Sequence, residues 1–182
     1  MERIAEFQKV SFEEFSKGYT DCFPEQTAET REEADRKARE ENTRAAYEAL
    51  KLPCRATMGS AGYDFFLPAD IALRPGEGVK IPTGVRARMA EGWVLLIFPR
   101  SGLGFKYRLQ LDNTVGVIDA DYYGADNEGH SFIRLTNDSR TGKTLALRAG
   151  DAFAQGIFLP FGIAADDAAE GARTGGFGST SA

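Results

Sequence analysis

The sequence predicts an all-β fold, a jelly-roll-like distorted barrel preceded by a helical N-terminal extension. Most of the 20 Gly and 7 Pro residues lie after Leu52, where they divide the chain into short segments bounded by turns. In those segments apolar residues recur at a period of about 2 instead of about 3.6, as strands require. A chain of 182 residues can bury one main core, so we expect one main domain.

Residues 1–52 form the predicted extension. Ser11 with Glu14 three residues later is a capping box, which marks the start of a helix. Phe15 and Tyr19 follow at helical spacing. A short amphipathic helix is therefore expected to begin at Ser11.

A second helix is expected from the capping box of Thr30 and Glu33 to about Leu50. Its charged residues are those of a solvated face, and its apolar face is narrow. We expect it to pack against another surface, on the exterior of the assembly, rather than to form a core. The apolar members of that face are Ala34, Ala38, Ala45 and Ala49.

Residues 53–165 are assigned to the β-barrel domain. Alternation of apolar residues and arginines in Gly84–Met89 predicts a half-buried strand. The continuously apolar run Trp93–Phe98 predicts a strand buried on both faces, and Ile133–Leu135 alternates again. Turns are expected between these strands at Pro75-Gly76, at Pro82 before Gly84, and at Thr141-Gly142. Residues 166–182 form a Gly-rich C-terminal arm that is expected to be mobile and to close over a ligand.

Composition limits the classes of function. The formal net charge of −5 argues against a general electrostatic footprint for nucleic acid, because such a footprint needs clustered Lys and Arg. The chain has neither an apolar N-terminal signal nor a membrane-spanning run, so we expect a soluble, cytoplasmic protein. The 2 cysteines, Cys22 and Cys54, are expected to be reduced thiols.

Five separated segments combine glycine with a polar side chain. In the first, an acid, Asp64, lies in an apolar strand, where it must be paired or hydrated. In the fourth, the amide of Gln155 interrupts another apolar strand. The segments are 61–66, 99–106, 113–124, 150–160 and 173–180.

The second segment, 99–106, has the composition of a phosphate-binding loop. Arg100 can hold phosphate oxygens in a fork, and Ser101 offers a hydroxyl. Glycines such as Gly102 leave backbone N–H groups free to approach an anion, and Lys106 adds a further cation.

The third and fifth segments add groups suited to a nucleotide. The third carries the amide of Asn113, a point of close approach at Gly116, a carboxylate and an aromatic ring, which together suit a base and a sugar. In the fifth, Phe177 can stack on a base, and phosphate could be bound by Arg173, Ser179 and Thr180.

In their order and content these five segments resemble the motifs of homotrimeric dUTPases, from about Ala56 to Thr180. The resemblance implies hydrolysis of dUTP to dUMP and pyrophosphate, which removes dUTP from the nucleotide pool and supplies dUMP for dTMP synthesis. It also implies a homotrimer with shared active sites and a Mg²⁺ ion held mainly by substrate phosphates and water, without dedicated protein ligands.

The resemblance further assigns catalytic roles. Asp119 would deprotonate a water for attack on the α-phosphorus, and Gln155 would help to hold that water. Asp64 would order the site at a subunit boundary.

Substrate-binding roles follow from the same resemblance. Tyr122 would pack beneath the deoxyribose and exclude a 2′-hydroxyl. Asn113 would read uracil together with the hairpin backbone at Gly116, Val117 and Ile118. The phosphates would be bound by Arg100, Ser101 and Gly102 and by Arg173, Ser179 and Thr180 of the arm, while Phe177 would stack on the base; Lys106 and Gly178 are also expected to be substrate-binding residues.

Three features depart from the family pattern. Ala152 stands where a basic residue is usual, and Arg173 lies four rather than five places before Phe177. Residues 125–130 look like an insertion, whose acids Asp126 and Glu128 are expected to lie in a solvated loop.

Two alternatives stay open. A dCTP deaminase-like enzyme would need a glutamate three places before Asn137, where this chain has Arg134. A non-catalytic regulatory jelly roll that binds dUTP would have little need of Asp119 as a water-activating acid. His130, the only histidine, is expected to be a structural or surface residue.

Overall fold

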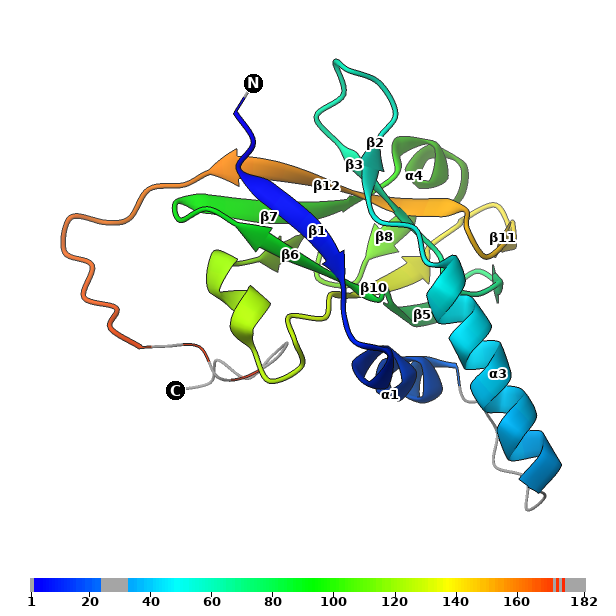
Figure 1. The fold of residues 1–182 in the computed structure, drawn as a ribbon. Helices are drawn as coiled ribbons and strands as arrows, with labels where there is room; N and C mark the ends of the chain where they lie inside the picture. The colour runs from blue at the N-terminus through cyan, green and yellow to red at the C-terminus, as the bar shows by residue number, and fades with distance from the viewer. Residues whose placement is uncertain (1, 24–32, 172, 174, 176–182) are drawn as a thin grey trace.

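The computed structural model describes residues 2–23, 33–171, 173 and 175, and most of its regular structure is β-strand (Figure 1). Its elements are, in order, β1 (Ala5–Lys9), α1 (Phe12–Cys22), α3 (Glu33–Ala49), β2 (Cys54–Arg55), β3 (Tyr63–Phe66), β4 (Ile71–Leu73), β5 (Gly78–Pro82), β6 (Val85–Met89), β7 (Trp93–Pro99), α4 (Ser101–Tyr107), β8 (Leu109–Leu111), β9 (Gly116–Ile118), the 3-10 helix η1 (Ala120–Gly124), β10 (Phe132–Asn137), β11 (Leu145–Leu147) and β12 (Ala152–Pro160).

The described strands pair into several antiparallel sheets. The largest has the order β2-β3-β12-β7-β9, and the others are β5-β10-β8, β11-β4 and β1-β6. These pairings do not close into one barrel within the described residues, so the jelly-roll-like barrel stays a prediction. The predicted turns are present: Gly76, Gly84 and Gly142 all have positive φ, the backbone region that glycine adopts without strain.

Strand β7 lies inside the largest sheet, between β12 and β9. The prediction that its residues are buried on both faces is wrong for the single chain, because only Leu95 and Ile97 are buried. Val94, Leu96 and Phe98, on the opposite face, are partly exposed. By contrast, β6 and β10 alternate buried and exposed residues as predicted.

The N-terminal extension is not wholly helical, which corrects the prediction for its first residues. β1 pairs with β6 from Ala5 opposite Met89 to Lys9 opposite Val85. The ring of Phe7 in β1 lies 5.7 Å from that of Phe65, a core residue of β3. The start of the chain therefore belongs to the β-domain.

Helix α1 begins where the capping box predicted. Ser11 is its N-cap, and the Ser11 hydroxyl accepts from the backbone N–H of Glu14 at 3.1 Å. Phe15 is fully buried and joins the main core, which consists of side chains from α1 and most of the strands. This helix is an integral part of the domain.

Helix α3 packs on α1, but not through the predicted alanines. Ala38, Ala45 and Ala49 are exposed, whereas Thr43 is buried and Tyr47 is half-buried. The Tyr47 hydroxyl donates to the carbonyl of Val10, and its ring contacts those of Phe12 and Phe15. The predicted cap Thr30 lies outside the described residues, as does the side chain of Ala34.

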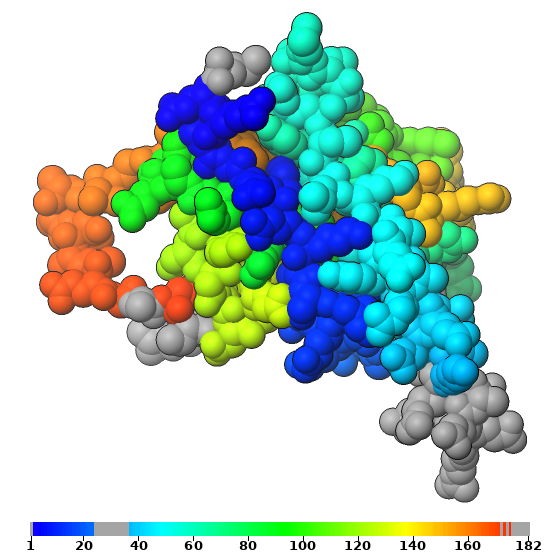
Figure 2. All heavy atoms as spheres, in the orientation of Figure 1, coloured from blue at the N-terminus to red at the C-terminus, as the bar shows by residue number. Residues whose placement is uncertain are grey.

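The segment after β12 is separate from the domain. Residues 161–171 are exposed, and Figure 2 shows them in orange, standing away from the body of the molecule. They return toward the yellow-green region that contains η1. No helix of the described chain has the length and apolar character needed to cross a membrane.

Candidate functional site

Three of the predicted site residues meet at the C-terminal end of β7. Arg100 directly follows β7 and is the N-cap residue of α4. Its Nε lies 3.2 Å from Oδ1 of Asp64, and Asp64 in β3 is directly opposite Gln155 in β12. The strand order β3-β12-β7 thus brings an acid, an amide and a guanidinium together from distant parts of the sequence.

Gln155 is held in place from two sides. Its Nε2 donates to the carbonyl of Pro99 at 3.3 Å. A Cβ atom at Gly62 would lie only 2.7 Å from Gln155 Oε1, so a larger residue at 62 would displace the amide. The glycine of the first segment therefore makes room for the amide of the fourth.

The rest of the phosphate-binding segment is open to solvent. Ser101 and Gly102 form the exposed first turn of α4, and Lys106 is exposed at its last turn. Phe105 is 91% exposed, an unusual state for a large apolar side chain. Among the described residues, none covers the polar groups of α4 or the ring of Phe105.

The turn between β8 and β9 carries the predicted base-reading groups, but it is not the predicted hairpin, because β8 pairs with β10 and β9 with β7 in different sheets. Asn113 is exposed at the turn, and the next residue, Thr114, adopts a positive φ of 67°. A Cβ atom on Gly116 would lie 3.1 Å from Cβ of Ile97, its partner in β7. Val117 points outward and is 53% exposed.

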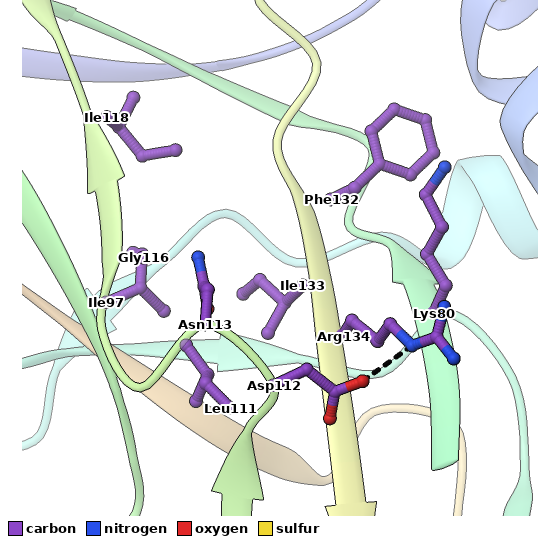
Figure 3. Close-up of a pocket in the computed structure, with 10 residues that line it drawn as sticks. All are labelled: Lys80, Ile97, Leu111, Asp112, Asn113, Gly116, Ile118, Phe132, Ile133 and Arg134. Carbon is purple, nitrogen blue, oxygen red and sulfur yellow. Dashed lines mark ion pairs between the residues drawn. The ribbon is translucent and has the colours of Figure 1, made fainter. Parts of the chain in front are cut away.

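The turn between β8 and β9 borders a pocket of about 470 Å³ (Figure 3). Ile97, Leu111 and Ile133 form an apolar wall, and Asn113 lies at the edge of the pocket. The ion pair between Asp112 and Arg134, with N···O of 2.6 Å, closes one side. The remaining lining residues are Lys80, Gly116, Ile118 and Phe132.

Asp119 and Tyr122 lie at the other end of β7. Asp119 precedes η1, and its side chain is 51% exposed. Arg173 Nη1 lies 2.8 Å from Asp119 Oδ2 and 3.3 Å from Asp121 Oδ1. The same guanidinium lies 5.0 Å from the centroid of the Tyr122 ring. The arm therefore covers the acid and the ring that were predicted to face the substrate.

The hydroxyl group of Tyr122 is buried. Tyr122 is 2% exposed, and burial raises the pKa of its hydroxyl. That hydroxyl donates to the carbonyl of His130 at 2.8 Å and accepts from Nδ2 of Asn127 at 2.7 Å. The ring is consequently fixed at its far end.

The group of Asp64, Arg100 and Gln155 does not meet the group of Asp119, Tyr122 and Arg173 within one chain. Ile118, next to Asp119, pairs with Leu95 near the start of β7, whereas Arg100 follows the end of that strand. Arg100 lies five positions after Leu95, which is about 17 Å along an extended strand. Figure 1 shows α4 and the yellow-green 3-10 turn on opposite sides of the molecule.

Comparison with known proteins identifies the family. The dUTPase family model matches residues 48–181. Over 136 residues the chain is 43% identical to a deoxyuridine 5′-triphosphate nucleotidohydrolase of Lactococcus lactis, covering 73% of this chain and 89% of the relative. The chain belongs to the dUTPase family.

Solved structures of dUTPases have a similar fold. The dUTPase of Streptococcus mutans is 43% identical and has a TM-score of 0.57, covering 64% of this chain and 90% of that one. A mutant of the dUTPase from phage phi11 of S. aureus is 26% identical, with a TM-score of 0.56 over 68% of this chain and 92% of that one. The phage protein coordinates a structural Mg(II) ion.

Ala152 is one departure from the dUTPase pattern. At Ala152, where a basic residue is usual, the carbonyl accepts from Nη1 of Arg100 at 3.4 Å. The fifth dUTPase motif is described only at Arg173 and Gly175, so Phe177, Gly178, Ser179 and Thr180 lie outside the described residues.

The insertion at residues 125–130 is not the solvated loop that its acids predicted. Asp126 is exposed, but Glu128 accepts from both the backbone N–H and the hydroxyl of Ser11. Although partial burial acts in the opposite sense, these hydrogen bonds lower the pKa of Glu128. The error arose because the partner lies 117 residues away in sequence.

His130 is a structural residue, as expected, and is fully buried. The backbone N–H of Gly84 donates to its Nε2 at 2.9 Å, and its Nδ1 lies 3.2 Å from Glu14 Oε1. Burial lowers the pKa of His130 to about 4, so the ring is neutral at pH 7 and its proton is on Nδ1, facing Glu14. Sequence analysis missed Asn127 as a partner of Tyr122, and we find no local signal that would have indicated it.

Proposed function

We propose that this dUTPase-family chain hydrolyses dUTP to dUMP and pyrophosphate, with Asp119 as the base that activates water for attack on the α-phosphorus. The proposal is supported by the extent of the likeness, since the chain spans 89% of a nucleotidohydrolase that acts on the same substrate. The observation that carries the mechanism is the position of Asp119. It directly follows β9, whose residues Gly116 and Ile118 line the pocket, and it lies three residues before Tyr122.

The uracil base would bind at the turn between β8 and β9. Asn113 at the pocket edge offers an amide donor and acceptor, which suits a base edge that carries both. The close contact of Gly116 with Ile97 supports exclusion of a methyl group at this point, because β9 has no room to shift toward β7. The same contact argues for dUTP over dTTP.

The deoxyribose would pack on the ring of Tyr122, where Arg173 now lies. Substrate would take that face, and Arg173 would move from Asp119 and Asp121 to the phosphates. The ion pairs support this exchange, since triphosphate oxygens are negatively charged, as are the carboxylates that now bind the guanidinium. Freed from Arg173, the Asp119 carboxylate can accept a proton from water.

The phosphates would be held by Arg100, Ser101 and Gly102 of a neighbouring subunit in a homotrimer. The separation of the two groups along β7 supports a shared site, because neither group alone contains both a base and a phosphate-binding loop. The partly exposed apolar face of β7 and the exposed ring of Phe105 supply surface that assembly could bury. Asp64 would hold Arg100 in position at this boundary, and Gln155 would orient the water.

Mg²⁺ fits the oxygen donors of this site. Asp119 and Asp121 present carboxylates that are more than half exposed, at 51% and 58%, next to the proposed place of the phosphates. Among the described residues no group of three or more His, Cys, Asp and Glu side chains could hold a metal ion by itself. When bound with the substrate, Mg²⁺ would neutralise phosphate charge.

The same proposal gives the chain a β-domain at 53–165 and a closing arm at 166–182, while β1 and α1 of the predicted extension at 1–52 join the β-domain through pairing with β6 and through the core residue Phe15. The exposure of residues 161–171 supports a separate arm. The continuous core formed by strands of several sheets supports a jelly-roll-like arrangement of the β-domain.

Release of pyrophosphate tests the proposed reaction. With Mg²⁺ present, turnover of dUTP, dTTP, dCTP and UTP is measured for the native chain, Asp119→Asn and Asp126→Asn. We expect dUTP to be strongly preferred and Asp119→Asn to lower kcat by at least about 100-fold, because general-base catalysis contributes that much. Asp126 is exposed in the same region and serves as the matched control. Equal turnover by the native chain and Asp119→Asn would refute the base, and failure to cleave dUTP would refute the function.

A second experiment tests the arm. Deleting residues 173–182 should reduce dUTP turnover and change the melting temperature little, since the ion pairs that it removes join Arg173 to half-exposed carboxylates of Asp119 and Asp121. Full activity without these residues would contradict a closing arm.

A further inference from the structure

The insertion at residues 125–130 encloses the hydroxyl group of Tyr122. Asn127 Nδ2 donates to that hydroxyl at 2.7 Å and to the carbonyl of His130 at 3.3 Å, while the hydroxyl itself donates to the same carbonyl at 2.8 Å. A donor and an acceptor from one loop therefore fix the ring. Because Tyr122 is 2% exposed, water has little access to replace a lost partner.

The orientation of the Asn127 amide indicates which atom matters. Its Oδ1 is buried and has no hydrogen-bond partner among the described residues, whereas its Nδ2 has two. A buried acceptor without a partner costs free energy. The amide therefore interacts with its surroundings through Nδ2, the donor to Tyr122.

The backbone of the insertion is shaped to bring Asn127 to this place. Glu128 and Gly129 both have positive φ, at 57° and 71°. A Cβ atom at Gly129 would lie 2.7 Å from the carbonyl oxygen of Tyr122. The loop therefore folds back directly onto the residue whose hydroxyl it binds.

The N-terminal segment holds this loop from outside. In an ordinary capping box Glu14 would bond to the backbone N–H of Ser11, but here that N–H donates to Glu128, and Glu14 bonds to His130 instead. Residues 8–14 contact η1 and the insertion at three points. These are Tyr123 Oη to Gln8 Oε1 at 2.7 Å, Ser11 N to Glu128 Oε2 at 2.8 Å, and His130 Nδ1 to Glu14 Oε1 at 3.2 Å.

We propose that Asn127 is a positioning residue for Tyr122, and that residues 8–14 of the N-terminal segment keep it in place, so that the segment sharpens the choice of dUTP over UTP. The inference rests on the proposed function, in which the Tyr122 ring packs against the sugar. A ring fixed at its hydroxyl cannot move away from a 2′-hydroxyl, so UTP meets a rigid surface. A ring without this bond can tilt and accept the ribonucleotide.

The experiment is a double-mutant cycle with Asn127→Ala and Tyr122→Phe, which keeps the ring and removes the hydroxyl. For each variant kcat and KM are measured with dUTP and with UTP. We expect Asn127→Ala to raise kcat/KM for UTP about fivefold, the value of one hydrogen bond, with kcat and KM for dUTP within about twofold of native, so that the dUTP/UTP ratio of kcat/KM falls about fivefold. In the Tyr122→Phe background, Asn127→Ala should have no further effect on selectivity.

Two further variants complete the test. Asp126→Ala, an exposed neighbour in the same loop, should leave the ratio unchanged. Ser11→Ala, which removes one bond to Glu128 far from Tyr122, should lower the ratio about twofold and keeps the inference testable if Asn127→Ala fails to fold.

The outcomes separate the two proposals. If the native chain cleaves dUTP selectively but Asn127→Ala keeps that selectivity, or loses it equally in the Tyr122→Phe background, the positioning role is refuted and the function stands. A folded Asn127→Ala whose melting temperature falls without any change in the ratio also refutes it, since that residue would be structural only. A native chain that does not cleave dUTP refutes the function itself.

Discussion

The two ends of strand β7 carry two halves of the proposed site, and they are built differently. At one end Tyr122 is buried and its hydroxyl has two partners from the insertion. At the other end Arg100 is 44% exposed, and Ser101 and Gly102 lie open to solvent. The sugar-facing half is thus fixed within one chain, whereas the phosphate-facing half is open. In the proposed site, selectivity would therefore be built into the subunit, while catalysis would depend on what assembly adds.

The largest effect is expected at the open end. Arg100→Ala should lower kcat/KM for dUTP by about 100-fold or more, because it removes a charge-assisted contact to the phosphates. Its melting temperature should fall only slightly, because Arg100 is 44% exposed, although the change leaves the carboxylate of Asp64, 21% exposed, without this partner. Steady-state kinetics and thermal melting check both values, with Arg88→Ala, another exposed arginine, as control. A loss of stability that matches the loss of activity would contradict the comparison.

At the buried end, acid should reduce stability through His130. Its pKa is lowered to about 4 by burial, so the folded protein stays unprotonated at pH values where the unfolded chain binds a proton. The stabilisation is therefore complete above the ordinary value near 6.5 and is lost as the pH falls toward 4. We expect a loss of about 2 kcal/mol between pH 7.5 and pH 5.

Glu14 opposes this effect only at the acid end of the range. Burial raises its pKa, so the folded state takes up that proton first and regains stability as the pH falls. Denaturant unfolding at a fixed protein concentration measures the slope with pH, and His130→Gln should make it shallower. An identical slope in the variant would show that His130 is not the titrating group.

A smaller effect is expected at the N-terminal segment. Ser11→Ala should lower the free energy of unfolding by about 1 kcal/mol, because it removes the cap of α1 and a bond to Glu128. Ser16→Ala in the same helix is the matched control and should be neutral. If both substitutions lower the free energy of unfolding equally, the cap of α1 and the contact of Ser11 with Glu128 do not stabilise the N-terminal segment.

Sequence analysis correctly predicted the helix start and the turns whose conformation depends on residues close by in sequence. Ser11 could be identified as a cap because its partner Glu14 is three residues away. The glycines at 76, 84 and 142 marked turns because their backbone conformation is difficult for other residues. The five motifs gave the candidate residues on similar grounds.

Contacts between distant residues were the ones that sequence analysis missed. β1 has no clear alternation, and its strand character depends on pairing with β6 some eighty residues later. The alanines of α3 suggested an inner face, but the helix turns Thr43 and Tyr47 inward because aromatic residues of α1 lie there. Asn127 was missed because two residues with positive φ, Glu128 and Gly129, direct the loop back to Tyr122.

The most direct test of the account is a mixing experiment with two inactive variants. Asp119→Asn loses the base and Arg100→Ala loses the phosphate contact, so neither should cleave dUTP alone. If each site takes Asp119 from one subunit and Arg100 from another, random reassembly of an equal mixture restores both residues in about a quarter of the sites. We therefore predict about one quarter of native pyrophosphate release after the variants are unfolded and refolded together. No recovery, with native activity regained when the native chain is treated alone, would contradict a site shared between subunits.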